Sequence, residues 1–536
     1  MWERGREAGL RSNAQGWGSA EYRDAIQTLC QTGLGDVNLI LASNRGPVEF
    51  RRDATGTLRT QRGQGGLVTA LSSMVECLDT TWVASPFTAT DAEVGTAEVP
   101  MGERLLSLAF VTLEAQDYHR YYNEVSNSLL WFLQHGITHA PEHPEFDGEA
   151  WKSWESYERV NRRFAEAIAR EARRSSKRPV IMIHDYHLYL VPGYLRRLLP
   201  EAVIQHFTHI CWPGPDLWWQ VPTRMRRAIM ESMAACDIVG FHTPRFAKNF
   251  LATVEEVLGY PTDLGGGLIE APERRVWVRD YPISIDPDGI QRVAESPAVR
   301  AVEAELGLEQ SGLNLVQVAR TDPSKNLLRS LKAMDLFLQQ HPRYRGQIRF
   351  WGILPASRQG SEHYRSYLDR LWEGVQAVNR RHGQKGWEPV TVFLENSYPR
   401  AIAVMKHYDL LLVNSLADGM NLVAKEGPMV NRRDGVLLLS ETIGAANELM
   451  DGALAINPYD LVGMAEAFER GLSMARSERR RRLAVLRESI QANPIHRWVH
   501  DQLLDLEACL KPRLRISPFY APEGVHPPDP DVMTRG

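Results

Sequence analysis

Short apolar runs alternate with longer helix-like segments along this sequence, and the alternation occurs in two successive series. The first series has its apolar runs at residues 37–43, 179–184, 203–210, 237–243 and 275–285. The second has them at residues 313–320, 347–354, 389–395, 409–415 and 435–441. A short apolar run bounded by turn residues is typical of a strand buried on both faces of a parallel sheet. Two such series in tandem predict an α/β protein with two Rossmann-like, doubly wound parallel-sheet domains.

The length of 536 residues agrees with two large domains, because a single hydrophobic core rarely serves more than about 300 residues. We expect five parts: residues 1–36 as an N-terminal extension, 37–286 as the first Rossmann-like domain, 287–490 as the second, 491–512 as a C-terminal helix and 513–536 as a proline-rich tail. The extension is expected to be a disordered arm, a surface helix or a start assigned too early in the sequence. The C-terminal helix is expected to pack back on the first domain.

The charge and the cysteine content narrow the class of protein. A formal net charge of -4 gives no basic excess for binding nucleic acid or an anionic membrane. The five cysteines lie far apart, without a CxxC pair or zinc-ligand spacing, which indicates a reducing compartment. The sequence starts without the apolar core of a signal peptide and has no apolar run of transmembrane length. We therefore expect a cytoplasmic protein without nucleic-acid or membrane partners.

Candidate binding residues are sought just after the predicted strands, because open α/β sheets bind ligands beyond the carboxyl ends of their strands. Arg320 and Lys325 follow the strand predicted at residues 313–320 and lie five positions apart. An arginine donates forked hydrogen bonds and a lysine supplies a mobile point charge, so the pair suits a diphosphate. A solvated turn that caps a helix has a similar composition, and the spacing alone leaves both interpretations open.

A second candidate site follows the strand predicted at residues 409–415. Gly419 allows a close backbone approach to a ligand, and a helix is expected to start directly after it. The backbone amides expected at that helix start are those of Met420, Asn421 and Leu422. Asp418 precedes the helix and Glu426 lies eight residues later, about two turns in, where the two carboxylates could bind two sets of sugar hydroxyls. An N-cap aspartate followed by an ordinary helical glutamate is the alternative interpretation.

The segment His184-Asp185-Tyr186-His187 also follows a predicted strand, and its H-D-x-H spacing suggests metal ligands. The sequence offers no third and fourth ligand in a suitable context, so we expect no catalytic metal ion. His242 follows another strand and is interpreted as a structural residue.

Nine strings of this sequence occur in the order typical of one enzyme family: NRGPV, GQGGL, YYNEVSNSLLW, IHDYHL, HICWPGP, RTDPSKN, LPASR, DGMNLVAKE and GAANEL. From about residue 37 to about residue 510 the chain resembles the trehalose-6-phosphate synthases. DGMNLVAKE and IHDYHL are the most specific of the strings. The resemblance implies a retaining glycosyltransferase of the GT-B fold, in which two Rossmann-like domains face a central cleft.

The resemblance also assigns the donor side, residue by residue. Donor-binding roles fall to Gly65, Gly66, Arg320, Lys325, Asp418, Gly419, Met420, Asn421, Leu422 and Glu426. In this assignment Arg320 and Lys325 neutralise the donor diphosphate. Asp418 holds hydroxyls of the donor glucose, and Glu426 binds the nucleotide ribose. The two glycines belong to a loop that closes over the donor.

The acceptor and catalytic residues follow from the same resemblance. Catalytic roles fall to His209, Asp185, Arg320 and Lys325, and acceptor binding falls to Arg45, Tyr122, Trp131, Asp185 and Arg358. His209 lies beside the donor sugar and Asp185 orients the acceptor. Arg45, Tyr122 and Arg358 surround the 6-phosphate. Two arginines suit a dianionic acceptor.

Three departures from the family pattern lie near the expected sugar pockets. Cys211 and Trp212 interrupt the usual loop after the strand at residues 203–210, Asn326 replaces a common glycine, and FLQHG at residues 132–136 replaces a proline and an aromatic pair. The nucleotide base and the acceptor therefore stay open, whereas the reaction type does not depend on these positions.

The implied reaction transfers glucose from a nucleoside diphosphate glucose to glucose 6-phosphate, giving trehalose 6-phosphate with retention and without a cofactor. Alternatives on the same fold are a glucosylglycerol-phosphate synthase and a pseudo-glycosyltransferase that joins cyclitols. A non-catalytic sugar-phosphate sensor would be expected to lack a donor residue, yet all of them are present. The expected partners are the nucleotide sugar and the sugar phosphate, and the expected assembly is a homo-oligomer.

Overall fold

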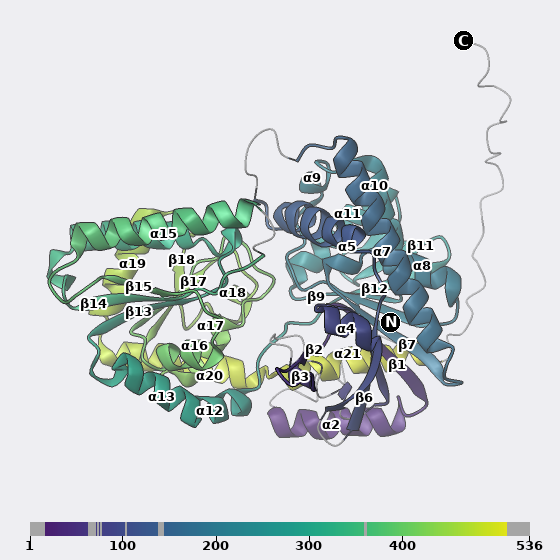
Figure 1. Cartoon of the computed structure of the whole chain (residues 1–536), viewed down its shortest axis with the longest axis horizontal. Coiled ribbons are helices and arrows are strands. Elements are labelled where there is room, and N and C mark those ends of the chain that lie inside the picture. The colour runs from purple at the N-terminus through teal and green to yellow at the C-terminus, as the bar shows by residue number, and fades with distance from the viewer. Residues whose placement is uncertain are drawn as a thin grey trace, which may run out of the picture.

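The computed structural model describes residues 17–62, 71, 74–75, 78–101, 104–137, 144–358 and 362–511. Gly65 and Gly66, which were predicted to bind the donor, lie outside the described residues. Two lobes lie side by side, one built from the first half of the chain and the other from the second (Figure 1). Each lobe has its own sheet. Among the described residues, no helix is both long and apolar enough to cross a bilayer.

The N-terminal sheet has ten strands. Their order is β10 (Thr262–Asp263), β11 (Leu268–Ala271), β12 (Arg274–Asp280), β9 (Ile238–Phe241), β8 (Val203–Phe207), β7 (Arg178–His184), β1 (Val37–Arg45), β4 (Thr80–Ser85), β6 (Arg104–Phe110) and β5 (Thr96–Met101). From β12 to β6 all neighbours are parallel, and the antiparallel pairs lie at the two edges. The chain reverses its direction of winding between β1 and β7, which makes that point the switch point of the sheet.

The C-terminal sheet has six strands, all parallel. Their order is β15 (Val390–Phe393), β14 (Ile348–Ile353), β13 (Leu313–Val318), β16 (Leu410–Val413), β17 (Val436–Ser440) and β18 (Leu454–Ile456). In chain order this is 3-2-1-4-5-6, the order of a Rossmann sheet, with the switch point between β13 and β16. The predicted fold class, two doubly wound α/β domains of the GT-B type, is confirmed.

Helices cover both sheets. In the N-terminal half they are α2 (Ser19–Thr32), α4 (Ala89–Val94), α5 (Ala115–His119), the π-helix η1 (Arg120–Leu130), α6 (Trp131–Gln134), α7 (Gly148–Ala172), α8 (Val191–Leu198), α9 (Pro215–Trp218), α10 (Thr223–Met233) and α11 (Pro244–Leu258). In the C-terminal half they are α12 (Pro287–Ala294), α13 (Pro297–Leu306), α14 (Leu327–Gln340), α15 (Glu362–His382), α16 (Tyr398–Lys406), α17 (Val423–Val430), α18 (Ala446–Leu449), α19 (Leu461–Ser473), α20 (Arg476–Ala492) and α21 (Ile495–Leu510). The described residues also form a hairpin of β2 (Val48–Arg52) and β3 (Leu58–Arg62) and the short 3-10 turns η2 (Tyr186–Leu188), η3 (Leu308–Gln310), η4 (Pro323–Lys325) and η5 (Pro342–Tyr344).

Helix α11 illustrates how local sequence sets an element's ends. Thr243 caps its first turn by accepting a hydrogen bond from the backbone N–H of Phe246, and Pro244 occupies the first helical position, where a missing N–H does no harm. Gly259 ends the helix with a φ of 72°, a left-handed conformation that glycine adopts without strain.

The last helix, α21, returns to the N-terminal lobe and packs beneath its sheet (Figure 1). The side-chain amide of Gln205 in β8 donates to Gln502 at 2.8 Å, and the Tyr281 hydroxyl donates to Asp505 at 2.6 Å. Helix α2 lies against α21, with the rings of Tyr22 and His500 in edge contact at 5.5 Å. Within the N-terminal extension, residues 19–32 therefore form a surface helix with a buried face, one of the expected alternatives.

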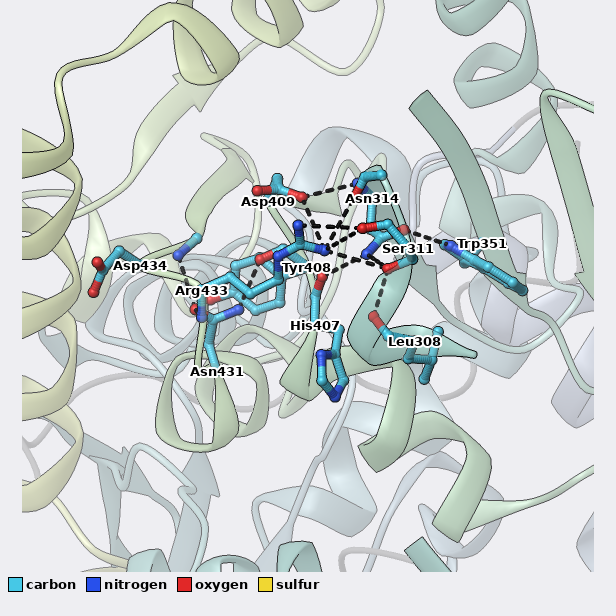
Figure 2. Close-up of polar contacts among 12 residues, drawn as sticks. Leu308, Ser311, Asn314, Trp351, His407, Tyr408, Asp409, Asn431, Arg433 and Asp434 are labelled. Carbon is cyan, nitrogen blue, oxygen red and sulfur yellow. Dashed lines mark hydrogen bonds and ion pairs between the residues drawn. The ribbon is translucent and has the colours of Figure 1, made fainter. Parts of the chain in front are cut away.

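A buried polar cluster ties the amino ends of the C-terminal strands together (Figure 2). The Asp409 carboxylate accepts a hydrogen bond from the backbone N–H of Asn314 at 2.9 Å and lies 3.2 Å from Arg479. The side chain of Asn314 accepts from Trp351 Nε1 at 2.9 Å. This cluster lies at the opposite edge of the sheet from the carboxyl ends, where ligands are expected to bind.

Candidate active site

The two donor-side motifs lie at the switch point of the C-terminal sheet. Arg320 and Lys325 follow β13, and Asp418 follows β16, the neighbouring strand. Lys325 Nζ forms an ion pair with the Asp418 carboxylate. Burial raises the pKa of Asp418, but the ion pair and hydrogen bond with Lys325, together with nearby His135 and the hydrogen bond from Asn421, outweigh burial, so the net pKa is lowered. Arg320 is exposed beside this pair, so its charge is available to a ligand.

The helix after Asp418 begins later than expected. Asn421 has a φ of 82°, and this left-handed conformation keeps residues 418–422 in a loop, so that α17 starts at Val423. Glu426 consequently lies in the first turn of the helix, whereas the sequence placed it about two turns in. The Asn421 side chain donates to Asp418 at 3.0 Å. Met420 has a buried side chain, so only its backbone is placed to bind a ligand.

Glu426 accepts a hydrogen bond at Oε1 from the hydroxyl of Tyr398, at the start of α16, at 3.3 Å. Burial raises the pKa of Glu426 to about 7, although this hydrogen bond opposes the shift. The carboxylate is thus poised to accept further hydrogen bonds, as a ribose would supply them.

Gly419 brings the two domains together. A Cβ atom on this residue would overlap the backbone carbonyl oxygen of His209 and would lie 3.0 Å from Cδ2 of His242. His209 follows β8 of the N-terminal sheet, so the loop at residues 418–422, which is predicted to bind the donor, touches the other domain at this position. The glycine is required for this close approach.

Asp185 and His209 lie side by side after the neighbouring strands β7 and β8. The Asp185 carboxylate accepts a hydrogen bond from the backbone N–H of His209 at 3.1 Å, and Asp185 itself has a φ of 76°. Backbone strain of this kind is concentrated at functional sites. Burial raises the pKa of Asp185 to about 6, and burial lowers the pKa of His209 well below its ordinary value, which leaves a neutral imidazole.

Arg45 and Tyr122 lie on the N-terminal side of the predicted acceptor site. Arg45 ends β1, and its guanidinium lies 4.0 Å from the centre of the Phe87 ring. Tyr122 belongs to the π-helix η1 and stacks between the rings of Tyr118 and His187, at 5.6 Å and 5.8 Å. A π-helix widens the helical turn and is frequent at functional sites.

Trp131 and Arg358 meet across the two domains. The guanidinium of Arg358 lies 3.8 Å from the centre of the Trp131 ring and donates to the hydroxyl of Tyr186 at 3.0 Å. It also forms an ion pair with Asp322, at 3.1 Å. Arg320 lies 5.7 Å from the same indole ring. The structure thus brings the donor-side and acceptor-side arginines to one aromatic side chain.

Sequence reasoning missed Asp322, Tyr186 and Tyr364. Asp322 lies between the two cations of RTDPSK, and this position was a usable signal. Tyr186 lies within IHDYHL and contacts Arg358 directly. Tyr364, near the start of α15, contacts Arg358 and Asp322 but has no sequence pattern that marks it.

The departures from the family pattern have separate structural explanations. Trp212 was expected beside the donor pocket, but it is fully buried in the N-terminal core and packs on Trp218 at 4.8 Å. Asn326 has a φ of 60°, a left-handed conformation that asparagine tolerates better than most residues. Its side chain also donates to the carbonyl oxygens of Asn414 and Pro458, at 3.1 Å and 2.6 Å.

A cavity of about 300 Å³ lies behind the acceptor-side helix η1, lined by apolar residues such as Phe132 and Trp154. It includes none of the predicted site residues.

Within the part of the chain that the structure describes, no group of three or more histidine, cysteine, aspartate or glutamate side chains is arranged to hold a metal ion.

Two Rossmann-like domains whose charged switch points meet through Gly419, Trp131 and Arg358 define a glycosyltransferase of the GT-B class. The comparisons with known proteins then give the family. The sequence model of glycosyltransferase family 20 matches residues 37–508, and the chain belongs to this family. It is a nucleotide-sugar-dependent glycosyltransferase related to the trehalose-6-phosphate synthases.

The relatives are similar over most of their lengths. A trehalose-6-phosphate synthase of Mycolicibacterium paratuberculosis is 34% identical over 487 residues, covering 88% of this chain and 95% of that protein. An E. coli structure bound with UDP-2-fluoro glucose is 28% identical with a TM-score of 0.77, covering 88% of this chain and 99% of the other. A synthase of Burkholderia xenovorans in complex with glucose-6-phosphate is 27% identical with a TM-score of 0.75, covering 88% of this chain and 100% of the other. The chain spans 63% of the bifunctional synthase/phosphatase of Thermoproteus tenax, to which it is 33% identical.

Proposed function

We propose that the protein transfers glucose from UDP-glucose to glucose 6-phosphate and forms trehalose 6-phosphate with retention. The observation that carries the proposal is the placement of Arg320, Lys325 and Asp418 at one switch point, opposite Arg45 and Asp185 at the other. The cations of the first group suit a diphosphate and the arginine of the second suits a phosphorylated acceptor. The ligands of the E. coli and Burkholderia relatives support the choice of donor and acceptor.

In the proposed reaction the bond between the anomeric carbon of glucose and the diphosphate oxygen breaks, and a bond to the acceptor hydroxyl oxygen forms on the same face. The proton of that hydroxyl passes to the leaving diphosphate oxygen. Arg320 and Lys325 stabilise the charge that develops on the diphosphate, and this electrostatic contribution is usually the largest in such a reaction. Asp185 orients the acceptor hydroxyl, and the neutral His209 lies beside the donor sugar.

The charge stabilisation comes from protein cations in this scheme, so the proposed reaction uses no catalytic metal ion. Nucleotide release should then persist in excess EDTA. A loss of activity that added Mg²⁺ restores would contradict this part of the proposal.

The substrate pair is tested by crossing UDP-, GDP- and ADP-glucose with glucose 6-phosphate and glycerol 3-phosphate and measuring nucleotide release. The proposal predicts the highest kcat/KM for UDP-glucose with glucose 6-phosphate, and release that depends on both. Faster release with glycerol 3-phosphate would favour a glucosylglycerol-phosphate synthase. No release with any pair would favour a cyclitol-joining enzyme or a non-catalytic sensor.

Two further parts of the proposal concern the setting of the reaction. We place the enzyme in the cytoplasm, where nucleotide sugars and sugar phosphates are both available, and we propose that it works as a homo-oligomer. Light scattering coupled to size exclusion tests the second point, because a mass equal to one 60.7 kDa chain would contradict it.

A further inference from the structure

Asp322 is fully buried at the meeting point of the two domains, and its two carboxylate oxygens have different partners. Oδ1 accepts hydrogen bonds from Trp131 Nε1 at 3.3 Å and from the backbone N–H and hydroxyl of Ser324 at 3.0 Å and 2.9 Å. Oδ2 accepts from Arg358 Nη1 at 3.1 Å and from the Tyr364 hydroxyl at 3.3 Å. Oδ1 therefore holds the donor-side turn and the Trp131 indole, whereas Oδ2 holds the acceptor-side arginine.

The carboxylate stays ionised although it is buried. Burial raises the pKa of Asp322, but the nearby positive charges, those of Arg358 and Arg320 foremost, together outweigh burial and lower the pKa to about 2. Removing one partner of a buried ion pair strongly destabilises the folded protein, because the other charge is left buried without compensation. Arg358 and Asp322 therefore stabilise each other in their buried positions.

Arg358 depends on this support. It lies in the loop after β14 with a φ of 46°, and its side chain is almost fully buried. Trp131 and Tyr186 hold the guanidinium from the N-terminal domain, whereas Asp322 and Tyr364 hold it from the C-terminal domain. A free arginine side chain has about 2 kcal/mol of rotamer entropy, and contacts of this kind fix it before a ligand arrives.

The same carboxylate also shapes the donor side. Asp322 caps the 3-10 turn Pro323–Lys325 through its hydrogen bond from Ser324, and Lys325 at the end of that turn pairs with Asp418. A single buried charge thus fixes the positions of the acceptor-side arginine and the donor-side lysine.

We propose that Asp322 is a positioning residue that holds Arg358 ready for the phosphate of the acceptor and keeps it in register with the donor-side turn. The inference rests on the proposed function, because it concerns the same pair of substrates. It assigns acceptor selectivity to a residue that touches neither substrate.

The test is steady-state kinetics of Asp322→Asn, which keeps the side-chain shape and one acceptor oxygen but removes the charge that faces Arg358. We expect the KM for glucose 6-phosphate to rise about tenfold or more and the KM for UDP-glucose to change less than about threefold. The ratio of kcat/KM for glucose 6-phosphate to kcat/KM for unphosphorylated glucose should fall in the same variant.

Asp409→Asn is the matched control, since Asp409 is also a buried, ion-paired aspartate of the C-terminal domain but belongs to the polar cluster at the amino ends of the strands (Figure 2). Its variant should lose stability with both KM values unchanged. If Asp322→Asn does not fold, Tyr364→Phe removes a hydroxyl shared by Arg358 and Asp322 and should raise the same KM by a smaller factor.

Two results would overturn the inference. The first requires that the wild type is active. If the KM values for glucose 6-phosphate and UDP-glucose are then unchanged, or are raised by the same factor, in the Asp322 variant or in the Tyr364 variant that replaces it, the aspartate is purely structural. A wild type that is inactive with every substrate pair would overturn the proposed function itself, and the inference with it.

Discussion

Gly419 of the donor loop packs directly against the backbone carbonyl of His209, so the C-terminal and N-terminal domains meet where a side chain has no room. This contact places the loop that carries Asp418 beside the strand ends that carry Asp185. The relative position of the donor-binding and acceptor-binding groups therefore depends on a glycine whose role is to allow close contact between the domains.

Gly419→Ala should separate the two loops, because the new methyl group would overlap the His209 carbonyl oxygen. Small displacements of reacting groups reduce rates steeply, and we expect kcat/KM to fall by about a hundredfold. Gly148→Ala is the matched control, since a Cβ there meets nothing within 4 Å. Equal kcat/KM values for the two variants would show that the contact is dispensable.

Arg320→Ala should lower kcat by about a hundredfold to a thousandfold, as expected when one charged contact to a developing anion is lost. The side chain is exposed, so the midpoint of thermal unfolding should change little. Parallel measurements of turnover and unfolding test both statements. Near-normal turnover would remove Arg320 from the diphosphate site.

Substitution of Glu426 should affect the stability of the protein and the binding of the donor in opposite directions. Its folded pKa of about 7 lies above its ordinary value of 4.5, so its contribution to stability is fully present below pH 4.5 and is lost as the pH rises through about 7. Glu426→Gln should therefore raise the free energy of unfolding at pH 8 by about 1 kcal/mol, while the KM for the donor rises. Denaturant titrations at pH 5 and pH 8 check the sign, and a variant that is less stable than wild type at pH 8 would refute the burial argument.

Asn326→Gly restores the glycine that is common in the family at this position. Glycine accepts the φ of 60°, but the variant loses the hydrogen bonds to Asn414 and Pro458. We expect a net loss of stability of about 1–2 kcal/mol with both KM values unchanged, because the side chain points into the domain. Increased stability would mean that relief of backbone strain outweighs the two hydrogen bonds.

Most of the strands that are buried on both faces were predicted, although β4 (Thr80–Ser85) was not. The apolar run at residues 37–43 corresponds to β1 (Val37–Arg45), and the run at residues 409–415 contains β16 (Leu410–Val413). Edge strand β5 (Thr96–Met101) went unpredicted because half of its residues are exposed and its sequence, TAEVPM, has no continuous run of large apolar residues. Partial burial weakens the apolar signal on which such predictions depend.

The candidate site was predictable where it depends on strand ends and unpredictable where it depends on contact between domains. Arg320 and Asp418 follow apolar runs, and a rule about sheets was enough to select them. The role of Asp322 depends on Trp131 and Arg358, which are distant in sequence and meet only when both domains are folded. The late start of α17 was missed because no rule predicts the left-handed conformation of Asn421.

The stereochemistry of the product tests the central proposal most directly. The protein is incubated with UDP-glucose and glucose 6-phosphate, and the anomeric protons of the disaccharide phosphate are measured by NMR. The account predicts two α-anomeric signals and no reducing end, as in α,α-linked trehalose 6-phosphate. A β-anomeric signal from the transferred glucose, or a product with a free reducing end, would contradict it.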